Sequence, residues 1–337
     1  MNRSILTLCL LIAVLMMFAC GKEEPVSPEA TQGEQPAVLA KEGDPAVLAM
    51  MDQINAQLAA SGSNLFLNEI QFFTIGQGRP SNRILQQPFR WVPNDARRAA
   101  QGIDITYIAD QSFQGTSSGV SAAATEAEID AAMTTWDTEQ ALKKVSIVKR
   151  SDPNVDISIF DEFFPTNLPF GDTNPDEPAP GNPFLGDIVN VGWYPRGYFE
   201  AVGGPGGGDG ILAFSVTFIF GSFDSQGNFI PSDINGDNYL DTALNEVYYN
   251  DRWGNPADPP PFPSTPQRFP WATGQLALPN IDVQTVGLHE NGHSLEIGHF
   301  GPPPAAVMNP VYAGPRISPF PSDEAAMEAV WASWPNP

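Results

Sequence analysis

The stretch from 287 to 300, GLHENGHSLEIGHF, contains every histidine of this 337-residue chain. His289 and His293 are four residues apart, so in a helix they lie one turn above each other and can both reach one ion. His299 follows six residues after His293. Neutral imidazole suits Zn²⁺, and a catalytic zinc takes three protein ligands and keeps a fourth position open. The fold therefore has to bring one helix and the bend after it around a single metal ion.

Glu290 lies beside the first of these histidines and is placed to act on water rather than to ligate the metal. A zinc ion lowers the pKa of a water molecule from about 15.7 to about 7, and a nearby carboxylate can accept the released proton. The residues thus predict a metal-activated water that hydrolyses a peptide bond, with Glu290 as general base and no covalent intermediate.

The pattern continues beyond the third histidine with Ala306-Val307-Met308-Asn309-Pro310-Val311-Tyr312. Together with H-E-x-G-H and His299, this stretch resembles the metzincin metalloproteases, and among them the matrixins, whose long histidine motif is followed by a Met-turn, A-[LV]-M-x-P-x-Y. The resemblance covers roughly residues 86 to 334. It implies a zinc endopeptidase with an α/β (α+β) metzincin-like fold, in which a twisted mixed sheet carries an active-site helix and a C-terminal helix. It also implies residue roles: zinc ligands His289, His293 and His299; general base Glu290; apolar floor Met308; substrate pocket Pro310 and Tyr312.

One residue departs from the family pattern, because Glu296 stands where the family has glycine. That glycine ends the helix in a left-handed conformation, which costs any other residue about 1 kcal/mol or more. Either Gly298 takes over the turn and His299 reaches the metal, or the helix continues and Glu296 becomes the third ligand. We expect His299, because the register of the Met-turn follows from it. The weakened turn also leaves an alternative function, a catalytically impaired zinc- or calcium-binding surface lipoprotein.

A second candidate metal site lies in the stretch from 233 to 241, where oxygen ligands occupy positions 1, 3, 5 and 9 of a loop that looks like the start of an EF-hand: Asp233, Asn235, Asp237 and Asp241. Such a loop would bind Ca²⁺. Against this, Asn238 stands at position 6 in place of glycine, and Leu244 stands at position 12 in place of glutamate. A turn rich in Asp and Asn between two strands explains the same residues equally well.

The N-terminal residues predict export. Arg3 precedes an apolar stretch, 5–18, which has the length of a signal sequence and is too short for a membrane-spanning helix. Met17-Phe18-Ala19-Cys20 resembles the lipobox of bacterial lipoproteins, which implies removal of residues 1–19 and a lipid on Cys20. Residues 20–44 then form a flexible tether. We expect a chain anchored to the bacterial outer membrane through lipid alone and exposed at the cell surface.

Two regions follow the tether: a small N-terminal segment, 45–85, and a catalytic domain, 86–337. The matrixin pro-peptide cysteine is missing, so if residues 45–85 form a removable pro-region they must block the site sterically. The chain has 39 acidic and only 16 basic residues. This negative charge excludes nucleic acid as a partner and leaves a protein or peptide substrate. The oligomeric state is not indicated. Periodicity predicts helices at 45–60, 125–143 and 322–332 and strands at 65–75, 103–109, 145–148, 155–160, 211–220 and 245–249.

Overall fold

The computed structural model describes residues 45–75, 87–109, 115–139, 145–151, 158–160, 185–258 and 269–335. All of these belong to one compact unit, Val38–Pro337. The residues expected to form the signal peptide, the lipidation site at Cys20 and the tether lie outside the described residues. Among the helices that are described, none combines the length and the apolar character needed to cross a membrane.

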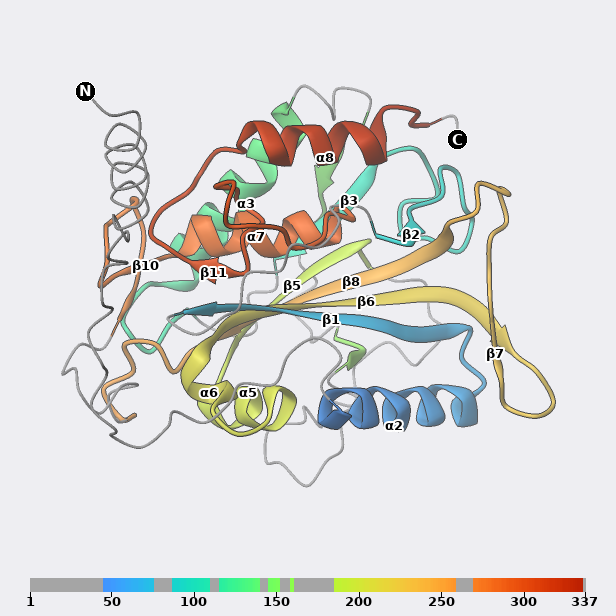
Figure 1. Ribbon diagram of the computed structural model, residues 1–337, viewed down its shortest axis with the longest axis horizontal. Coiled ribbons are helices and arrows are strands. Elements are labelled where there is room, and N and C mark those ends of the chain that lie inside the picture. Colours follow the sequence, from blue (N-terminus) through green and yellow to red (C-terminus); the bar gives the residue numbers. More distant parts are fainter. Residues whose placement is uncertain are drawn as a thin grey trace, which may run out of the picture. The chain divides into compact units, whose positions relative to one another are not determined.

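The described strands form a twisted, mixed sheet whose main path runs β11-β1-β6-β8-β5-β3-β4 (Figure 1). β6 runs antiparallel to both of its neighbours, β1 and β8, whereas β8, β5, β3 and β4 are parallel to one another. The bounds are β1 Leu65–Ile75, β2 Phe89–Arg90, β3 Ile105–Ala109, β4 Ile147–Lys149, β5 Ile188–Tyr194, β6 Ile211–Phe223, β7 Phe229–Pro231, β8 Leu240–Asn250 and β11 Val311–Tyr312. A separate pair joins β9, Trp271–Ala272, to β10, Ile281–Asp282. The predicted α/β class with a mixed sheet is confirmed.

Helices cover both faces of this sheet (Figure 1). α3 (Ala122–Thr138), α7 (Val283–Ser294) and α8 (Pro321–Trp331) lie on one face, and α2 (Pro45–Ser61), α5 (Arg196–Gly203) and α6 (Gly207–Gly210) lie on the other. Each face has its own apolar core: Trp136, Met308 and Trp331 belong to the first, and Phe214 and Tyr248 to the second. Because side chains alternate along a strand, the central strands supply both cores.

The predicted elements agree with the structure at several places. The strand at 65–75 has the predicted bounds, and the helix predicted at 322–332 spans Pro321–Trp331. The helix predicted to start at Thr125 starts three residues earlier, because Ser121 caps it by accepting a hydrogen bond from the Ala124 N–H. The strand predicted at 155–160 lies partly outside the described residues, and 158–160 is not a strand.

The described part of the predicted N-terminal segment is built into the sheet. β1 lies between β6 and β11, and it pairs with β6 from Leu65, opposite Phe220, to Thr74, opposite Ile211. α2 packs over the same strand, and its Asn55 side chain exchanges two hydrogen bonds with the backbone of Leu67, at 3.0 and 2.7 Å. Residues 45–75 therefore fold together with the rest of the compact unit.

Candidate metal centre

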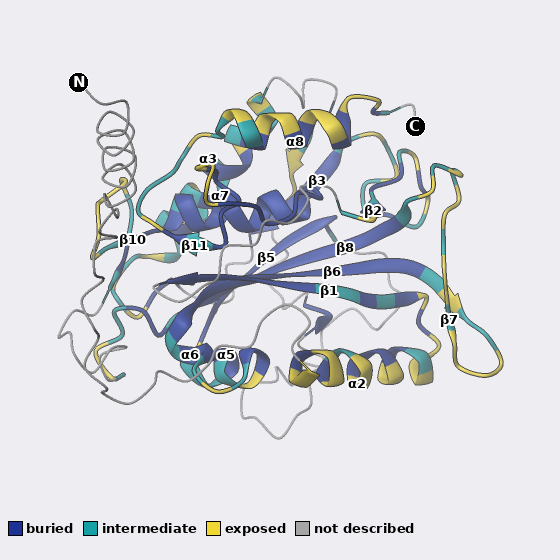
Figure 2. Cartoon of the chain, in the orientation of Figure 1, coloured by how far each residue is buried: buried dark blue, intermediate teal, exposed yellow. Residues whose placement is uncertain are grey.

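The helix that carries the histidine motif, α7, is buried almost throughout (Figure 2). Asp282 caps its N-terminus by accepting hydrogen bonds from the backbone N–H and the hydroxyl of Thr285, at 2.9 and 2.6 Å. Tyr312 accepts a hydrogen bond from the Asp282 N–H at 2.9 Å. The first turn of the helix is thus tied to the strand that follows the Met-turn.

Three indole groups fix α7 along its length. Trp136 donates to the Leu288 carbonyl at 2.9 Å, Trp91 to that of Ser294 at 2.9 Å, and Trp331 to that of Leu295 at 3.0 Å. The last two carbonyls lie at the helix C-terminus, where no partner exists within the helix. The three bonds leave little freedom for the histidine-bearing turns.

A buried amide pair ties the middle of α7 to the sheet. Asn291 donates to Asn190 on β5 at 3.0 Å, and Tyr249 on β8 donates to the same Asn190 oxygen at 2.7 Å. All three side chains are buried. Because buried polar groups need partners, this network favours one position of the helix over the sheet.

The turn after α7 is made at Glu296 itself, with φ of 70°. Its N–H donates to the His293 carbonyl at 2.8 Å, and the Ile297 N–H donates to the Gly292 carbonyl at 3.1 Å. These two bonds define a Schellman motif with glutamate at the position that usually holds glycine. The prediction that Gly298 takes over the turn is therefore wrong, since the left-handed residue already lies at 296. The alternative of a continuing helix is also wrong, because the helix ends at Ser294.

The Glu296 side chain is buried and accepts a hydrogen bond from the Thr242 hydroxyl at 2.8 Å. Burial raises its pKa to about 8, and the Thr242 hydroxyl together with the charges of Arg90 and Arg98 offset the rise only in part. The carboxylate is thus engaged with β8 and with charges from the 90–98 region. It is not the third member of the histidine cluster, which is His299.

The three histidine rings converge through their Nε2 atoms. The Nε2 of His289 lies 3.0 Å from that of His299 and 3.2 Å from that of His293, and the remaining pair lies 3.1 Å apart. Nitrogen ligands at the usual Zn–N distance around a tetrahedral ion lie about 3.3 Å from one another. Among the described residues, this is the group of three His, Cys, Asp or Glu side chains close enough to hold one ion. The residues fit a divalent metal.

In two of the three histidines, the hydrogen bond made by the Nδ1 atom determines the tautomer of the ring. His289 Nδ1 donates to the Val307 carbonyl and His293 Nδ1 to the Ile297 carbonyl, both at 2.7 Å. Burial lowers the pKa of both imidazoles well below the usual value, and the neighbouring histidines add to the effect. Both rings are therefore neutral, with the Nε2 lone pairs directed at one point, which is the arrangement that metal-ligating histidines show.

The Met-turn is held from α8. Asp323 accepts hydrogen bonds from the N–H groups of Val307 and Met308, at 2.8 and 3.2 Å. The Val307 carbonyl accepts a hydrogen bond from His289 Nδ1, and the Met308 N–H belongs to the same peptide unit. The Asp323 carboxylate therefore acts on the histidine through this one peptide unit. Met308 is buried against the helix: a Cβ added at Gly292 would lie 2.4 Å from its sulfur. Met308 thus packs against the histidine-bearing helix, whereas nothing in the sequence pattern marks Asp323.

Glu290 is fully buried, and neither of its carboxylate oxygens has a hydrogen-bond partner in the described part of the chain. Burial raises its pKa well above the usual value, and the nearby Ser215 hydroxyl on β6 opposes the rise. A buried carboxylate without partners costs free energy, so its place one residue after a candidate ligand calls for a function.

The two residues implied for a substrate pocket both contact β1. The Pro310 carbonyl accepts hydrogen bonds from the N–H and the hydroxyl of Thr74, at 3.2 and 3.1 Å. Tyr312 is paired with Ile75 in a parallel ladder. The ring of Phe73, the residue before Thr74 in β1, is stacked on His289, with centroids 3.8 Å apart and planes 10° from parallel. No spacing rule in the sequence links Phe73 to the histidines.

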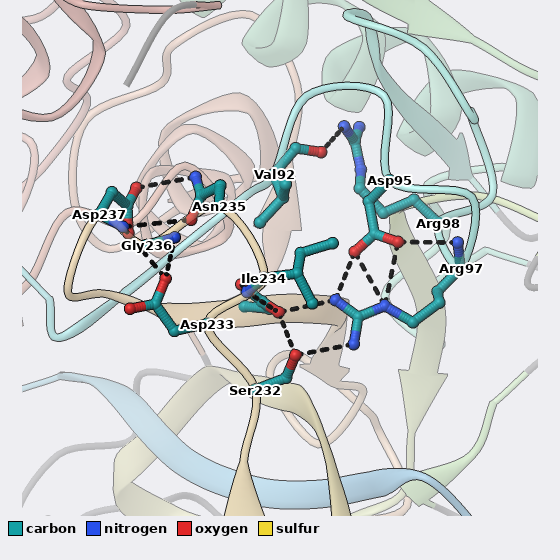
Figure 3. Close-up of polar contacts among 11 residues, drawn as sticks. Val92, Asp95, Arg97, Arg98, Ser232, Asp233, Ile234, Asn235, Gly236 and Asp237 are labelled. Atoms are coloured by element: carbon teal, nitrogen blue, oxygen red, sulfur yellow. Dashed lines mark hydrogen bonds and ion pairs between the residues drawn. The ribbon is translucent and has the colours of Figure 1, made fainter.

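Among the described residues, the three acidic side chains of the loop proposed for calcium do not form a group close enough to hold one ion; Asp233 and Asp237 are drawn in Figure 3. Asp233 accepts from the backbone N–H groups of Gly236 and Asn238, at 2.8 and 3.1 Å, and so stabilises its own turn. Asp241, which is buried, is paired with Arg97 at 2.6 Å. Its negative charge is thus neutralised by a cation of the chain, and the geometry gives the Ca²⁺ prediction no support.

Neither the models of known protein families nor the sequences of curated proteins match this chain. The function therefore has to be inferred from the site itself.

Proposed function

We propose that this protein is a zinc-dependent endopeptidase of metzincin type, exported and anchored to the outer membrane through lipid on Cys20. The observation that carries the proposal is the convergence of three Nε2 atoms within 3.2 Å of one another, with two Nδ1 atoms committed to backbone carbonyls. Imidazole ligands in such a set favour zinc over Ca²⁺ or Mg²⁺, which prefer oxygen.

The roles of the residues follow from their places. His289, His293 and His299 would hold the ion, which as a Lewis acid supplies an activated water and a polarised carbonyl. Glu290 is the group that accepts the water's proton and returns it to the leaving amine. Its lack of hydrogen-bond partners leaves both oxygens available for that task. Met308 packs against Gly292 and keeps this side of the histidine-bearing turn apolar.

A second candidate, a zinc-binding surface lipoprotein without turnover, is favoured by one observation. All three histidines are buried, and the most exposed, His299, has only 6% of its surface accessible. In this conformation of the protein, a polypeptide substrate does not reach the three histidines. The departure at Glu296 does not favour this candidate, because the turn forms and His299 joins the cluster despite it.

Glu290→Gln separates the two candidates. The variant keeps the size and burial of the side chain but cannot accept a proton. We expect elemental analysis to find one zinc per chain in the wild type and the variant, and casein cleavage to fall at least 100-fold in the variant alone. Glu328→Gln, an exposed change on α8, is the control and should cleave as the wild type does. Casein cleavage that resists both Glu290→Gln and a chelator would refute the endopeptidase, and zinc without any cleavage would favour the second candidate.

A further inference from the structure

Phe73 of β1 is one of the side chains that cover the buried histidines. His289 is fully buried, and the Phe73 ring of β1 covers one face of its imidazole at 3.8 Å. The same ring meets Tyr312 edge-on, with centroids 6.0 Å apart. A strand from the N-terminal segment is therefore in direct contact with a candidate metal ligand and with the segment after the Met-turn.

β1 also uses the backbone groups that an incoming peptide would need. It pairs antiparallel with β6, and its last two residues, Thr74 and Ile75, pair parallel with β11. Without β1, the edges of β6 and β11 would present unpaired N–H and C=O groups, which readily take up an extended chain. Ser215, the polar group beside Glu290, lies on this stretch of β6, opposite Gln71.

We propose that β1 is an internal occupant of this chain's peptide-binding site, and that the end of β1 from Phe73 to Ile75 has to leave before a substrate can bind. The position of β1 between β6 and β11 then takes an extended polypeptide that runs antiparallel to β6. The substrate carries a large apolar side chain, preferably aromatic, where Phe73 now stacks on His289. This inference rests on the proposed endopeptidase for its substrate, but the occupancy by β1 can be tested without catalysis.

The first experiment measures access to the site rather than activity. Diethyl pyrocarbonate acylates accessible imidazoles, and all three histidines of the chain belong to the cluster, so the absorbance change reports on this site alone. We expect metal-free Phe73→Ala to react at least ten times faster than the metal-free wild type. Phe66→Ala is the control, because it removes the same ring from the other end of β1, where Phe66 stacks on Phe229 at 4.3 Å. Equal rates for Phe73→Ala and the wild type, or equal acceleration in both variants, would overturn the proposal.

The second experiment fastens the end of β1 in place. Thr74 and Val311 are directly opposite in the parallel ladder. Neighbouring strands lie about 4.8 Å apart, within the Cα separations of about 4.4–6.8 Å that a disulfide spans. We expect the oxidised double variant Thr74→Cys/Val311→Cys to lose casein cleavage and to react with diethyl pyrocarbonate more slowly than the wild type, and reduction to reverse both effects. The two single variants, each with one introduced thiol, are the controls and should not respond to reductant.

The outcomes separate the two hypotheses. If the oxidised double variant, verified by its loss of free thiols, cleaves casein as fast as the reduced one, β1 does not occupy the substrate position and the inference fails while the endopeptidase stands. If no state cleaves casein, but the disulfide and Phe73→Ala change the acylation rate in opposite directions, the inference stands and the endopeptidase fails.

Discussion

Asp323 offers the sharpest test of how the site is held. Its carboxylate accepts hydrogen bonds from the N–H groups of Val307 and Phe320, both at 2.8 Å, and of Met308 at 3.2 Å. Asp323→Ala leaves these three donors without their acceptor in a buried region. Each orphaned group costs about 1–3 kcal/mol, and partial relaxation leaves a total of about 3–6 kcal/mol in the free energy of unfolding. Asp323→Asn keeps one oxygen as an acceptor, so we expect a smaller loss of about 1–2 kcal/mol.

The same substitutions should weaken metal binding, because the Val307–Met308 peptide unit links the two side chains: its N–H donates to Asp323 and its carbonyl accepts from His289 Nδ1. Partners of this kind contribute about 10–100-fold to metal affinity. Urea unfolding of the metal-loaded protein measures the stability, and competition with a chromophoric chelator measures the zinc affinity. Glu328→Ala, which removes an acidic side chain from an exposed position of the same helix, is the control. If Asp323→Ala differs from that control by less than about 0.5 kcal/mol and binds zinc equally well, the reasoning is refuted.

Two further changes probe the helix and its turn. Gly292→Ala places a Cβ 2.4 Å from the Met308 sulfur, so we expect a loss of about 1–3 kcal/mol in thermal unfolding, whereas Gly287→Ala on the same helix meets nothing closer than 3.6 Å and should be neutral or stabilising. Equal effects of the two would contradict the packing of Met308 on the helix. The pKa of Glu296 is about 8 in the folded chain, against an ordinary value of 4.5. Between these two values the folded chain keeps a proton that the unfolded chain loses, so the free energy of unfolding falls as pH rises from about 4.5 to about 8. Glu296→Gln should remove that decline, on the order of a few kcal/mol, in urea midpoints taken across this range; an unchanged decline would show that another group causes it.

The candidate metal centre was predictable from the sequence to the extent that its parts are local. The helix places two histidines on one face, and the third follows six residues after the second, so spacing alone indicates the cluster. The groups that complete it are distant in sequence. Asp323 reaches the site from α8 and Phe73 from β1, and each depends on packing that no periodicity encodes.

Glu296 shows why the local prediction also failed in part. The cost of a left-handed glutamate argued for moving the turn to Gly298, but the structure keeps the turn at 296. There the side chain is buried and accepts a hydrogen bond from Thr242, and the Schellman bonds satisfy the end of the helix. Tertiary contacts thus outweigh a local conformational cost of about 1 kcal/mol.

The strand Ile188–Tyr194 had no counterpart among the predicted elements. It is buried along its whole length in the parallel part of the sheet, so it lacks the alternation that identifies a half-exposed strand. Asn190 and Gly192 also interrupt its apolar run, and it follows a stretch rich in Pro and Gly. Asn190 is polar because it bonds to Asn291 and Tyr249, a reason that becomes visible only once α7 lies over the sheet.

The two halves of β1 differ in what they stabilise, and this makes a partial release of the strand physically reasonable. Leu65, Leu67 and Ile70 belong to the core under α2, where Asn55 also bonds to the strand's backbone. Phe73 and Ile75 belong to the other core, on the side of the histidine cluster. Exposing those two side chains costs about 1.5–3 kcal/mol each, and a peptide that places an apolar side chain on His289 and pairs with the same edges regains most of it. The N-terminal half can therefore stay in the sheet while the end of the strand is exchanged for substrate, and the apparent affinity of any substrate is reduced by the small fraction of molecules in which that end is free.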